Sequence, residues 1–423
     1  MDKFVIKGGK KLSGKIEVSG AKNAALPIMA AAILAQDNVK LKNVPDLKDV
    51  RTMIDVLKSL GMIVTDDFEA GEVALKVDTK LNSEAQYDLI KQMRASFVVL
   101  GPLLARFGKA RVALPGGCAI GSRPVDIHLK GLEKLGAKIV LGHGYVDAMC
   151  NKLTGNRIYL DFPSVGATEN IMMAATLAEG KTFIENAAKE PEIDDLAAIL
   201  NKMGAKIKGS GTDIIEIQGV KSLKGVTHSV VADRIEAGTF MVAAAITGGH
   251  LKIKNARIDH LESVIAKLQD AGVEFYKDGE YIEVVGPERM NAVSIKSLPY
   301  PGFPTDMQPQ FMAAMTLARG TSCVQETVFE NRFMHVAELK RMGANLQIKD
   351  RSVIIEGVKA LSGAPVMASD LRAGACLVLA GLAASKVTEI QRIYHIDRGY
   401  DQLEKKLAKV GADIKREKDN SQF

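Results

Sequence analysis

The sequence lacks several features that would point to particular functions at once. Its 423 residues include no tryptophan, and only 5% are aromatic, so there is little material for stacking nucleic-acid bases. The four cysteines show no CxxC spacing, and the seven histidines form no HExxH or mixed Cys/His run. Neither a disulfide framework nor a zinc site is therefore indicated. We expect no metal, no cofactor and a reduced, cytoplasmic setting.

Long apolar runs are missing as well. The first twenty residues contain lysines but no apolar signal core, and the longest apolar stretches, such as LPIMAAAILA at 26–35, are about half a membrane span. The formal charge of +6 suits small anionic substrates but is too weak to argue for nucleic acid. The length and the 47% hydrophobic content predict a soluble chain of two domains, without membrane or nucleic-acid partners. No pattern predicts the oligomeric state.

What the sequence does contain is an internal repeat. Six phrases such as LKSLGMIV, LEKLGAKIV and LAKVGADIK each predict an amphipathic helix that ends at a glycine and is followed by a β-strand. The glycines recur about every 70 residues, at Gly61, Gly136, Gly204, Gly272, Gly343 and Gly411. An alanine-rich helix recurs in step with them, and a helix that is apolar all round is a buried one. We therefore predict six α/β units, three in each domain around a helical core.

Polar residues precede each predicted buried helix. Helix N-termini carry unpaired N–H groups and partial positive charge, so they bind anions. We expect Ser164, Thr305 and Asp370 to be ordinary helix caps. Capping does not explain the cations found at such positions, which are Lys22, Arg94, Arg234 and Arg372. A cation there opposes the helix dipole and needs an anion, either a bound ligand or a neighbouring carboxylate such as Glu236. If all six helix starts face one cleft, it would suit a substrate with several phosphates or carboxylates.

One cysteine differs from the others. Cys118 lies in LPGGCAIGSRPVD at 114–126, where glycines and prolines predict a mobile loop, and Arg123 and Pro124 stand at the start of the next helix. A thiol near an arginine and a helix N-terminus can have a lowered pKa, or can act as a proton donor once anions bind. The remaining cysteines, Cys150, Cys323 and Cys376, are expected to be small buried hydrophobes.

Two further segments carry candidate reactive groups. Asp306 follows prolines in FPTDMQ, and a carboxylate among arginines is ordinarily an ion-pair partner with a lowered pKa. To act as a general base it would have to lie within reach of a hydroxyl. The segment RIYHIDRGY places Asp397 and Arg398 in the loop that matches the Cys118 loop in the repeat, and the adjacent His395 is expected to be structural.

The chain resembles the UDP-N-acetylglucosamine enolpyruvyl transferases, also called UDP-N-acetylglucosamine 1-carboxyvinyltransferases. The resemblance covers nearly the whole chain in order, through SGAKNAALP, MRAS, LPGGCAIGSRPVD, SVGATEN, FPTDMQ, ETVFENRFMHV, DLRAGA and RIYHIDRGY. It implies transfer of enolpyruvyl from phosphoenolpyruvate to the 3-hydroxyl of UDP-N-acetylglucosamine, by addition and then elimination of phosphate. This is the first committed step of peptidoglycan synthesis, which serves cell-wall biogenesis, cell shape and cell division.

The resemblance also implies a fold and a division of the chain. The fold would be two inside-out α/β barrels, each of three repeated units. One domain would comprise residues 22–230, and the other residues 1–21 together with 231–423. Closure of the domains and of the Cys118 loop would exclude water from the reaction.

Roles for individual residues follow from the resemblance. Cys118 would be the general acid and Asp306 the group that takes the sugar hydroxyl proton, with Lys22 and Arg398 completing the catalytic set. Phosphoenolpyruvate would be bound by Lys22, Asn23, Arg123, Arg372 and Arg398. The nucleotide sugar would be bound by Asn23, Arg94, Arg123, Pro124, Val125, Asp126, Ile127, Ser164, Val165, Gly166, Asp306 and Val328.

Three alternatives stand beside this prediction. The sister transferase that acts on shikimate phosphate shares the fold and the reaction route but lacks the cysteine loop. A non-catalytic paralogue would bind the nucleotide sugar without turnover, whereas Lys22, Cys118, Asp306 and Arg398 are all intact in this chain. Phosphate cyclisation on RNA ends would need a nucleotidyl-accepting histidine motif, and none is evident.

Overall fold

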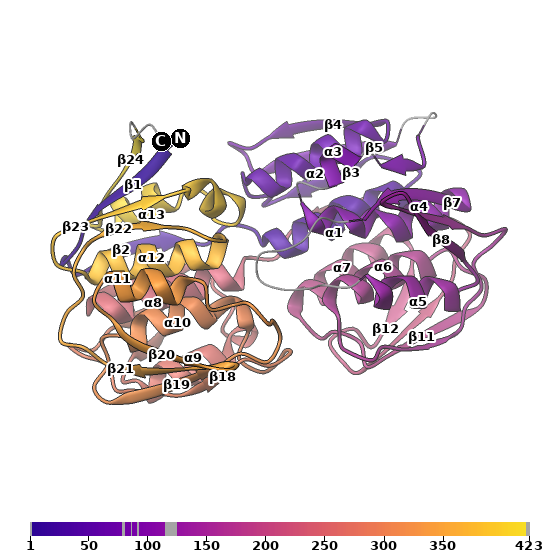
Figure 1. Ribbon diagram of the computed structural model, residues 1–423. Helices are drawn as coiled ribbons and strands as arrows, with labels where there is room; N and C mark the ends of the chain where they lie inside the picture. The colour runs from indigo at the N-terminus through magenta and orange to yellow at the C-terminus, as the bar shows by residue number, and fades with distance from the viewer. Residues whose placement is uncertain (1, 78–80, 86, 91–92, 115–124, 420–423) are drawn as a thin grey trace. The chain divides into compact units, whose positions relative to one another are not determined.

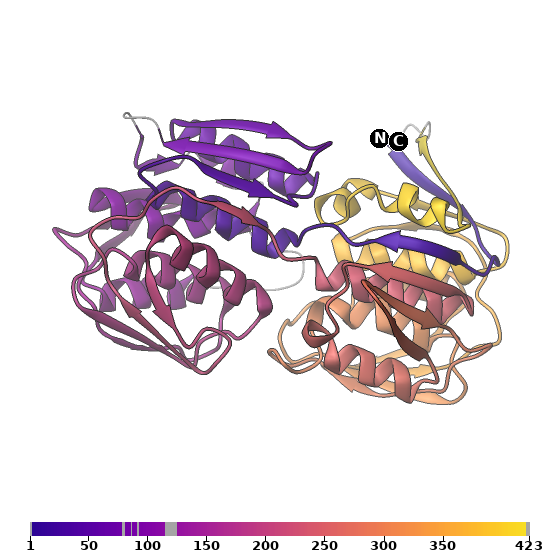
Figure 2. The same cartoon turned by 180° about the vertical axis from the view of Figure 1, so that it is seen from behind.

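The computed structural model describes residues 2–77, 81–85, 87–90, 93–114 and 125–419, with the backbone alone for Tyr87 and Arg94 (Figures 1 and 2). The chain divides into two compact units. The described residues of unit 1 come from 2–19 and 232–419, and those of unit 2 from 20–114 and 125–231. Each unit has its own cluster of buried hydrophobic residues, so each has an independent core.

The described strands form three four-stranded sheets in each unit, and all six sheets share one topology. Each sheet begins at one edge with a parallel pair of strands, and the next two pairs across the sheet are antiparallel. From that edge, the sheets of unit 1 are β22 (Pro365–Met367), β23 (Val387–Gln391), β1 (Asp2–Lys7) and β24 (Asp413–Lys418); β2 (Ser13–Glu17), β15 (His250–Lys254), β17 (Tyr281–Val285) and β16 (Glu274–Asp278); and β18 (Ile295–Lys296), β19 (Thr321–Gln325), β21 (Ser352–Glu356) and β20 (Asn345–Lys349). The sheets of unit 2 are β14 (Thr227–Ser229), β3 (Val39–Lys42), β5 (Glu72–Val77) and β4 (Met62–Asp67); β6 (Glu84–Ala85), β7 (Lys109–Ala113), β9 (Tyr145–Met149) and β8 (Lys138–Gly142); and β10 (Arg157–Tyr159), β11 (Lys181–Glu185), β13 (Ile214–Gln218) and β12 (Lys206–Lys208). This repetition confirms the predicted α/β fold of six repeated units.

The alanine-rich segments form the central helices, as predicted. In unit 1 the helices α8 (Arg234–Thr247), α10 (Gln308–Met315) and α12 (Leu371–Ala383) pack against one another, and Figure 1 shows them inside the sheets. In unit 2 the central segments are α1 (Lys22–Ala31) with η1 (Ala32–Leu34), η2 (Arg94–Val99) with α4 (Leu100–Phe107), and α6 (Val165–Ala175). These helices are largely buried, because their apolar residues leave no polar face to turn toward solvent.

The amphipathic helices each end where the sequence places a repeat glycine. They are α2 (Lys48–Ser59), α5 (Asp126–Lys134), α7 (Pro191–Met203), α9 (Glu262–Asp270), α11 (His335–Arg341) and α13 (Leu403–Lys409). The six repeat glycines have φ between 91° and 110°, a backbone conformation that costs glycine little because it has no Cβ. The remaining short helices are α3 (Tyr87–Ile90), η3 (Ile258–His260), η4 (Thr305–Met307) and η5 (Ile393–Arg398).

Two segments connect the units, and each is held by backbone hydrogen bonds beside the other. The chain passes from one unit to the other between Ser19 and Gly20 and again between Val231 and Ala232. In unit 1 the amide of Asp233 donates to the carbonyl of Ser19 at 2.8 Å, and in unit 2 the amide of Ala21 donates to that of Val231 at 2.7 Å. The two donating amides belong to Ala21 and Asp233, the residues that immediately precede α1 and α8. Among the described residues, no helix combines the length and apolar character that crossing a bilayer requires.

Candidate active site

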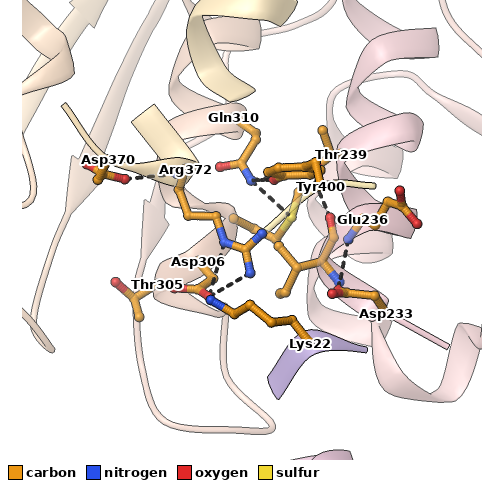
Figure 3. A network of polar contacts seen from close by, with 12 residues as sticks. Lys22, Asp233, Glu236, Thr239, Thr305, Asp306, Gln310, Asp370, Arg372 and Tyr400 are labelled. Carbon is orange, nitrogen blue, oxygen red and sulfur yellow. Dashed lines mark hydrogen bonds and ion pairs between the residues drawn. The ribbon is translucent and has the colours of Figure 1, made fainter. Parts of the chain in front are cut away.

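The starts of α8, α10 and α12 lie close together in unit 1 (Figure 3). Asp233 caps α8 by accepting hydrogen bonds from the amides of Ile235 and Glu236, at 2.8 and 3.0 Å. Asp370 caps α12 in the same way, through the amides of Arg372 and Ala373 at the same two distances. The capping prediction is therefore correct for Asp370.

Asp306 lies at the start of α10 and pairs with two arginines. Its Oδ1 accepts from Nη2 of Arg332 at 2.8 Å, and its Oδ2 accepts from Nε and Nη2 of Arg372 at 3.2 and 3.0 Å. The arginine side chains are only 3% and 1% exposed, whereas that of Asp306 is 26% exposed. The carboxylate is thus the ion-pair partner that the sequence predicts. It binds two buried arginines and is itself partly exposed to solvent.

A second buried carboxylate, Glu326, organises the segment that leads to Arg332. Its Oε2 accepts from the hydroxyl of Thr305 at 2.7 Å, while its Oε1 accepts from the amides of Val328 and Phe329 at 2.8 and 3.1 Å. Thr305 also accepts from Nη1 of Arg332 at 3.3 Å. The prediction that Thr305 caps its helix is wrong, because its hydroxyl instead ties the start of α10 to this segment.

Arg398 is held near the start of α12 by close packing of η5 against that helix. A Cβ on Gly374 would lie 2.5 Å from a side-chain atom of Ile396, and one on Gly399 would lie 2.2 Å from Leu371. These glycines therefore allow the two segments to approach. Arg398 itself is half-buried. The neighbouring Asp397 pairs with Arg416 at 2.6 Å, which makes it a structural partner.

The hydroxyl of Tyr400 belongs to a buried polar group beside Arg372. It lies 3.0 Å from Oγ1 of Thr239 and accepts from Nε2 of Gln310 at 3.1 Å (Figure 3). The guanidinium carbon of Arg372 lies 5.3 Å from the centre of the Tyr400 ring, within cation–π range. Burial raises the pKa of Tyr400, so the phenol stays neutral around pH 7. Arg372 thus contacts the Tyr400 ring as well as the carboxylate of Asp306.

In unit 2, Lys22 begins α1 and pairs with a carboxylate from α2. Its Nζ lies 3.3 Å from Oδ2 of Asp49, and the two side chains are 11% and 5% exposed. The carboxylate expected to balance a helix-start cation is therefore Asp49 for Lys22, and Asp306 for Arg372. The predicted Glu236 accepts instead from Lys406 at 2.7 Å and from the amide of Ser19 at 2.7 Å. Asn23 follows Lys22 and is half-buried.

The second group of predicted residues in unit 2 lies at the starts of α5 and α6, which pack together. Ser164 caps α6, its Oγ accepting from the amide of Ala167 at 3.4 Å, which confirms that prediction. Gly166 lies against the ring of His128 from α5. Val125 and Ile127 are half-buried, whereas Asp126 is exposed and lies 3.8 Å from Lys130. Val165 is half-buried at the first position of α6.

Several predicted residues are not placed. Cys118, Arg123 and Pro124 lie outside the described residues, and only the backbone of Arg94 is described, at the start of η2. The remaining site residues form one group in unit 1, around Asp306, and two neighbourhoods in unit 2, at α1 and at α5–α6. Of the described cysteines, Cys376 is buried, as predicted, while Cys150 and Cys323 are only half-buried.

Sequence reasoning missed four residues of these groups. Arg332, Glu326, Asp49 and His128 carry no signal by themselves, although ETVFENRFMHV contains two of them. Arg332 is the most informative, because its Nε is buried and has no hydrogen-bond partner among the described residues. A buried guanidinium with an unused donor, next to Asp306, is suited to receive an anion.

A buried histidine, His335, follows Arg332 by three residues. His335 is 2% exposed, and burial lowers its pKa to about 4, with Asp370 opposing this effect and Arg332 adding to it. The imidazole is therefore neutral at pH 7, so it adds no further positive charge to the arginine cluster.

The comparisons agree with the sequence resemblance. Residues 6–407 match the family model described as EPSP synthase (3-phosphoshikimate 1-carboxyvinyltransferase). The chain is 59% identical over 414 residues to UDP-N-acetylglucosamine 1-carboxyvinyltransferase 1 of Caldanaerobacter subterraneus subsp. tengcongensis, covering 98% of this chain and 99% of that protein. It is 60% identical over 421 residues to UDP-N-acetylglucosamine 1-carboxyvinyltransferase of Geobacter metallireducens, covering 99% and 100%.

Two solved structures share the fold. The enolpyruvyl transferase NikO from Streptomyces tendae aligns with a TM-score of 0.88 and 25% identity, over 98% of each chain. An EPSP synthase from Acinetobacter baumannii aligns with a TM-score of 0.76 over 99% of this chain and 100% of its own, at 19% identity, and so shows the fold alone. The enolpyruvyl transferase fold predicted from the sequence is confirmed.

The buried His335 gives a testable pH dependence of stability. Between pH 6.5 and 4 the unfolded chain binds a proton on this histidine that the folded chain does not, so the free energy of unfolding falls as pH falls. The loss reaches about 3 kcal/mol at the low end of this window. Urea unfolding at pH 7.5 and pH 5 should show a smaller loss in His335→Gln than in the wild type. His250→Gln, at an exposed histidine, is the control and should behave as wild type. Equal losses in the wild type and His335→Gln would contradict the assignment.

Proposed function

Because the chain belongs to the UDP-N-acetylglucosamine 1-carboxyvinyltransferase family, we propose that it transfers enolpyruvyl from phosphoenolpyruvate to the 3-hydroxyl of UDP-N-acetylglucosamine and releases phosphate. The observation that carries the proposal is identity near 60% over essentially the full length of relatives with that name. In a bacterial cell this places the chain at the first committed step of peptidoglycan synthesis, in the cytoplasm where both substrates occur.

The reaction needs one proton removed and one delivered. The sugar oxygen bonds to C2 of phosphoenolpyruvate as its hydroxyl proton leaves, and a proton is added at C3. Loss of a proton from C3 then expels phosphate from C2 and restores the double bond. Asp306 supports the first step, because it is an accessible carboxylate at a helix start, held in place by two arginines. We assign Cys118 to proton delivery at C3 on the strength of the resemblance.

The substrate anions account for the remaining residues. Arg372 and Arg398, with Arg123 and Lys22, are proposed to hold the phosphate and carboxylate of phosphoenolpyruvate, and Arg332 is added to this set. Guanidinium groups present paired N–H donors that match either anion. The nucleotide sugar is assigned to Asn23, Arg94, residues 123–127, Ser164, Val165, Gly166, Asp306 and Val328.

The two compact units correspond, in this proposal, to the domains 22–230 and 1–21 with 231–423. Their closure, together with the loop of Cys118, would exclude water while the proton is transferred. Phosphoenolpyruvate would otherwise be protonated without reaching the sugar.

The reaction is tested by measuring phosphate release from phosphoenolpyruvate with and without UDP-N-acetylglucosamine. Release should require both compounds, and the nucleotide sugar should gain the mass of an enolpyruvyl group. A parallel assay replaces the nucleotide sugar with 3-phosphoshikimate, because the family model bears that activity's name. Phosphate release with 3-phosphoshikimate as the acceptor, and none with UDP-N-acetylglucosamine, would show that the chain has the sister activity instead. Binding of the nucleotide sugar without phosphate release would favour the non-catalytic paralogue.

The role of Asp306 predicts a large loss of turnover in Asp306→Asn. The amide keeps the shape of the carboxylate but cannot take a proton, so kcat should fall by at least about a hundredfold. Binding of UDP-N-acetylglucosamine, measured by calorimetry, should persist if the fold is retained. The control is Asp278→Asn, which removes an exposed carboxylate paired with Lys252 and should leave kcat unchanged. A near wild-type rate in Asp306→Asn would exclude it as the base.

The role of Cys118 predicts a graded result for two substitutions. Cys118→Ser should remove most turnover, because a hydroxyl is a far weaker acid than a thiol, whereas Cys118→Asp should retain part of it as an alternative proton donor. Cys323→Ser, at a half-buried cysteine, is the control and should stay active. Equal rates in the wild type, Cys118→Ser and Cys118→Asp would refute the acid role.

A further inference from the structure

An arginine of β24 contacts three other segments of unit 1. Arg416 lies directly opposite Phe4 in the antiparallel pair of β24 with β1 (Figure 1). Its guanidinium carbon lies 5.0 Å from the centre of the Phe4 ring, and its Nη1 lies 3.6 Å from a carboxylate oxygen of Asp2. Its Nε donates to Oε1 of Glu404 in α13 at 2.9 Å. The third segment is η5, which Arg416 reaches through Asp397.

The contact of Arg416 with Asp397 involves two hydrogen bonds. Nη2 donates to Oδ1 at 2.6 Å and Nη1 donates to Oδ2 at 3.1 Å, so both carboxylate oxygens are bound at once. Two parallel hydrogen bonds between planar groups fix their orientation as well as their distance. Arg416 therefore holds the carboxylate of Asp397 in one place and one orientation relative to β24.

Asp397 immediately precedes Arg398, and both belong to η5, which packs against α12 and β1. On the other side of Arg398, Gly399 lies against Leu371 at the start of α12. The hydroxyl of Tyr400 belongs to the buried polar group beside Arg372. The backbone at Arg398 is thus held on both sides, on one side by core packing and on the other by the pair of Asp397 with Arg416.

These two ways of holding η5 differ in kind. The side chains of Arg416 and Asp397 are 30% and 36% exposed, so their pair is not part of the core. An exposed ion pair stabilises a fold little, but a bidentate pair within a network of charges has a well-defined geometry. The pair therefore contributes more to the placement of η5 than to the stability of unit 1.

The pair also balances a negative charge next to Arg398. The carboxylate of Asp397 belongs to the residue adjacent to an arginine that is proposed to bind phosphoenolpyruvate. Without a cation of its own, this carboxylate would repel a substrate anion and would compete with it for the guanidinium of Arg398. Arg416 occupies both oxygens of Asp397 from another strand, which removes this competition.

We propose that Arg416 is a positioning residue for Arg398. Through its two-point pair with Asp397 it holds the end of η5, so that the guanidinium of Arg398 is placed to receive an anionic group of phosphoenolpyruvate. The inference rests on the proposed function, which supplies that anion. Arg416 acts through Asp397 and does not touch the substrate. Binding of UDP-N-acetylglucosamine should be independent of this pair, because none of the residues assigned to the nucleotide sugar lies in η5 or β24.

The first experiment breaks the pair from each end. Arg416→Gln and Asp397→Ala should each lower kcat/KM for phosphoenolpyruvate about tenfold, since displacing a positioning group by about 1 Å can cost about a hundredfold. Arg416→Lys keeps the charge without the two-point geometry, so its loss should be smaller. The Kd for UDP-N-acetylglucosamine, measured by calorimetry without phosphoenolpyruvate, should equal that of the wild type in all three. A wild-type kcat/KM in both Arg416→Gln and Asp397→Ala would overturn the proposal.

The double variant Asp397→Ala/Arg416→Gln tests whether Arg416 acts through Asp397. Two residues that act only through their shared contact lose it once, so the double variant should be no worse than the more affected single variant. Two losses that multiply in the double variant would show that Arg416 acts by another route, for example through Glu404, and would overturn the proposal.

The matched control is Arg257→Gln in the same unit. Arg257 makes the same kind of two-point contact with Asp259, at 2.9 and 2.5 Å, but is not adjacent to a residue with an assigned role. Its kcat/KM should equal that of the wild type, and a loss as large as that of Arg416→Gln would contradict a specific role. If Arg416→Gln does not fold, Asp397→Ala decides alone, because it leaves Arg416 bound to Glu404. A wild-type kcat/KM in Asp397→Ala would then overturn the proposal.

The placement of Arg398 is also measured without substrate. Arginine labelled with ¹⁵N gives an Nε–H signal for each ordered side chain, and Arg398→Lys identifies the signal of Arg398. This signal should shift in Arg416→Gln, in which the chain neighbours of Arg398 are unchanged, and should stay in place in Arg257→Gln. An unmoved signal in Arg416→Gln would overturn the proposal.

The two proposals fail in different ways. If the wild type releases no phosphate from phosphoenolpyruvate, the proposed function is wrong, while the ¹⁵N spectrum still tests whether Arg416 positions Arg398. If the wild type turns over but neither kcat/KM nor the Arg398 signal changes in Arg416→Gln, only the role of Arg416 is wrong.

Discussion

The group in unit 1 depends on one carboxylate shared by two buried arginines. Guanidinium groups as deeply buried as those of Arg332 and Arg372 are strongly unfavourable without a partner, and removing the partner of a buried charge costs about 3–5 kcal/mol. Asp306 supplies that partner to both from the start of α10. It therefore brings together three segments of the unit. In the proposed reaction, the guanidinium donors that would bind a substrate anion are thus already ordered before the anion arrives. Preordered donors act without further reorganisation during the reaction.

The repeat explains how much of this arrangement could be predicted. Six glycines with positive φ and six alanine-rich helices are local features, each visible in a short window of sequence, and they gave the α/β units correctly. The caps Ser164 and Asp370 are local as well, because a helix cap bonds to amides two or three residues further on. The fold and the positions of the helix starts could thus be predicted from neighbouring residues alone.

The partners of the charged residues could not be predicted in this way. Lys22 pairs with Asp49 from another helix, and Asp306 pairs with Arg372, which is 66 residues away in the chain. The sequence shows that a cation at a helix start needs an anion, but several carboxylates in the chain are chemically equivalent candidates. Which one lies within 3.3 Å is decided by helix packing, and the expected Glu236 lies instead against Lys406. Thr305 was mistaken for a cap for the same reason, since Glu326 approaches from another strand end.

Helix packing also explains glycines whose purpose the sequence leaves open. Gly374 and Gly399 lie in DLRAGA and RIYHIDRGY, and both leave space for a side chain of the opposite segment. A Cβ at either position would clash with these side chains, so the two glycines allow η5 to pack closely against α12. Gly166 likewise leaves space in unit 2, where the ring of His128 lies against it. At α1 and α12 a charged side chain stands at the helix start and a carboxylate balances it. The chain therefore places cations at helix starts where helix packing also brings a carboxylate, which offsets the unfavourable interaction of the cation with the helix dipole.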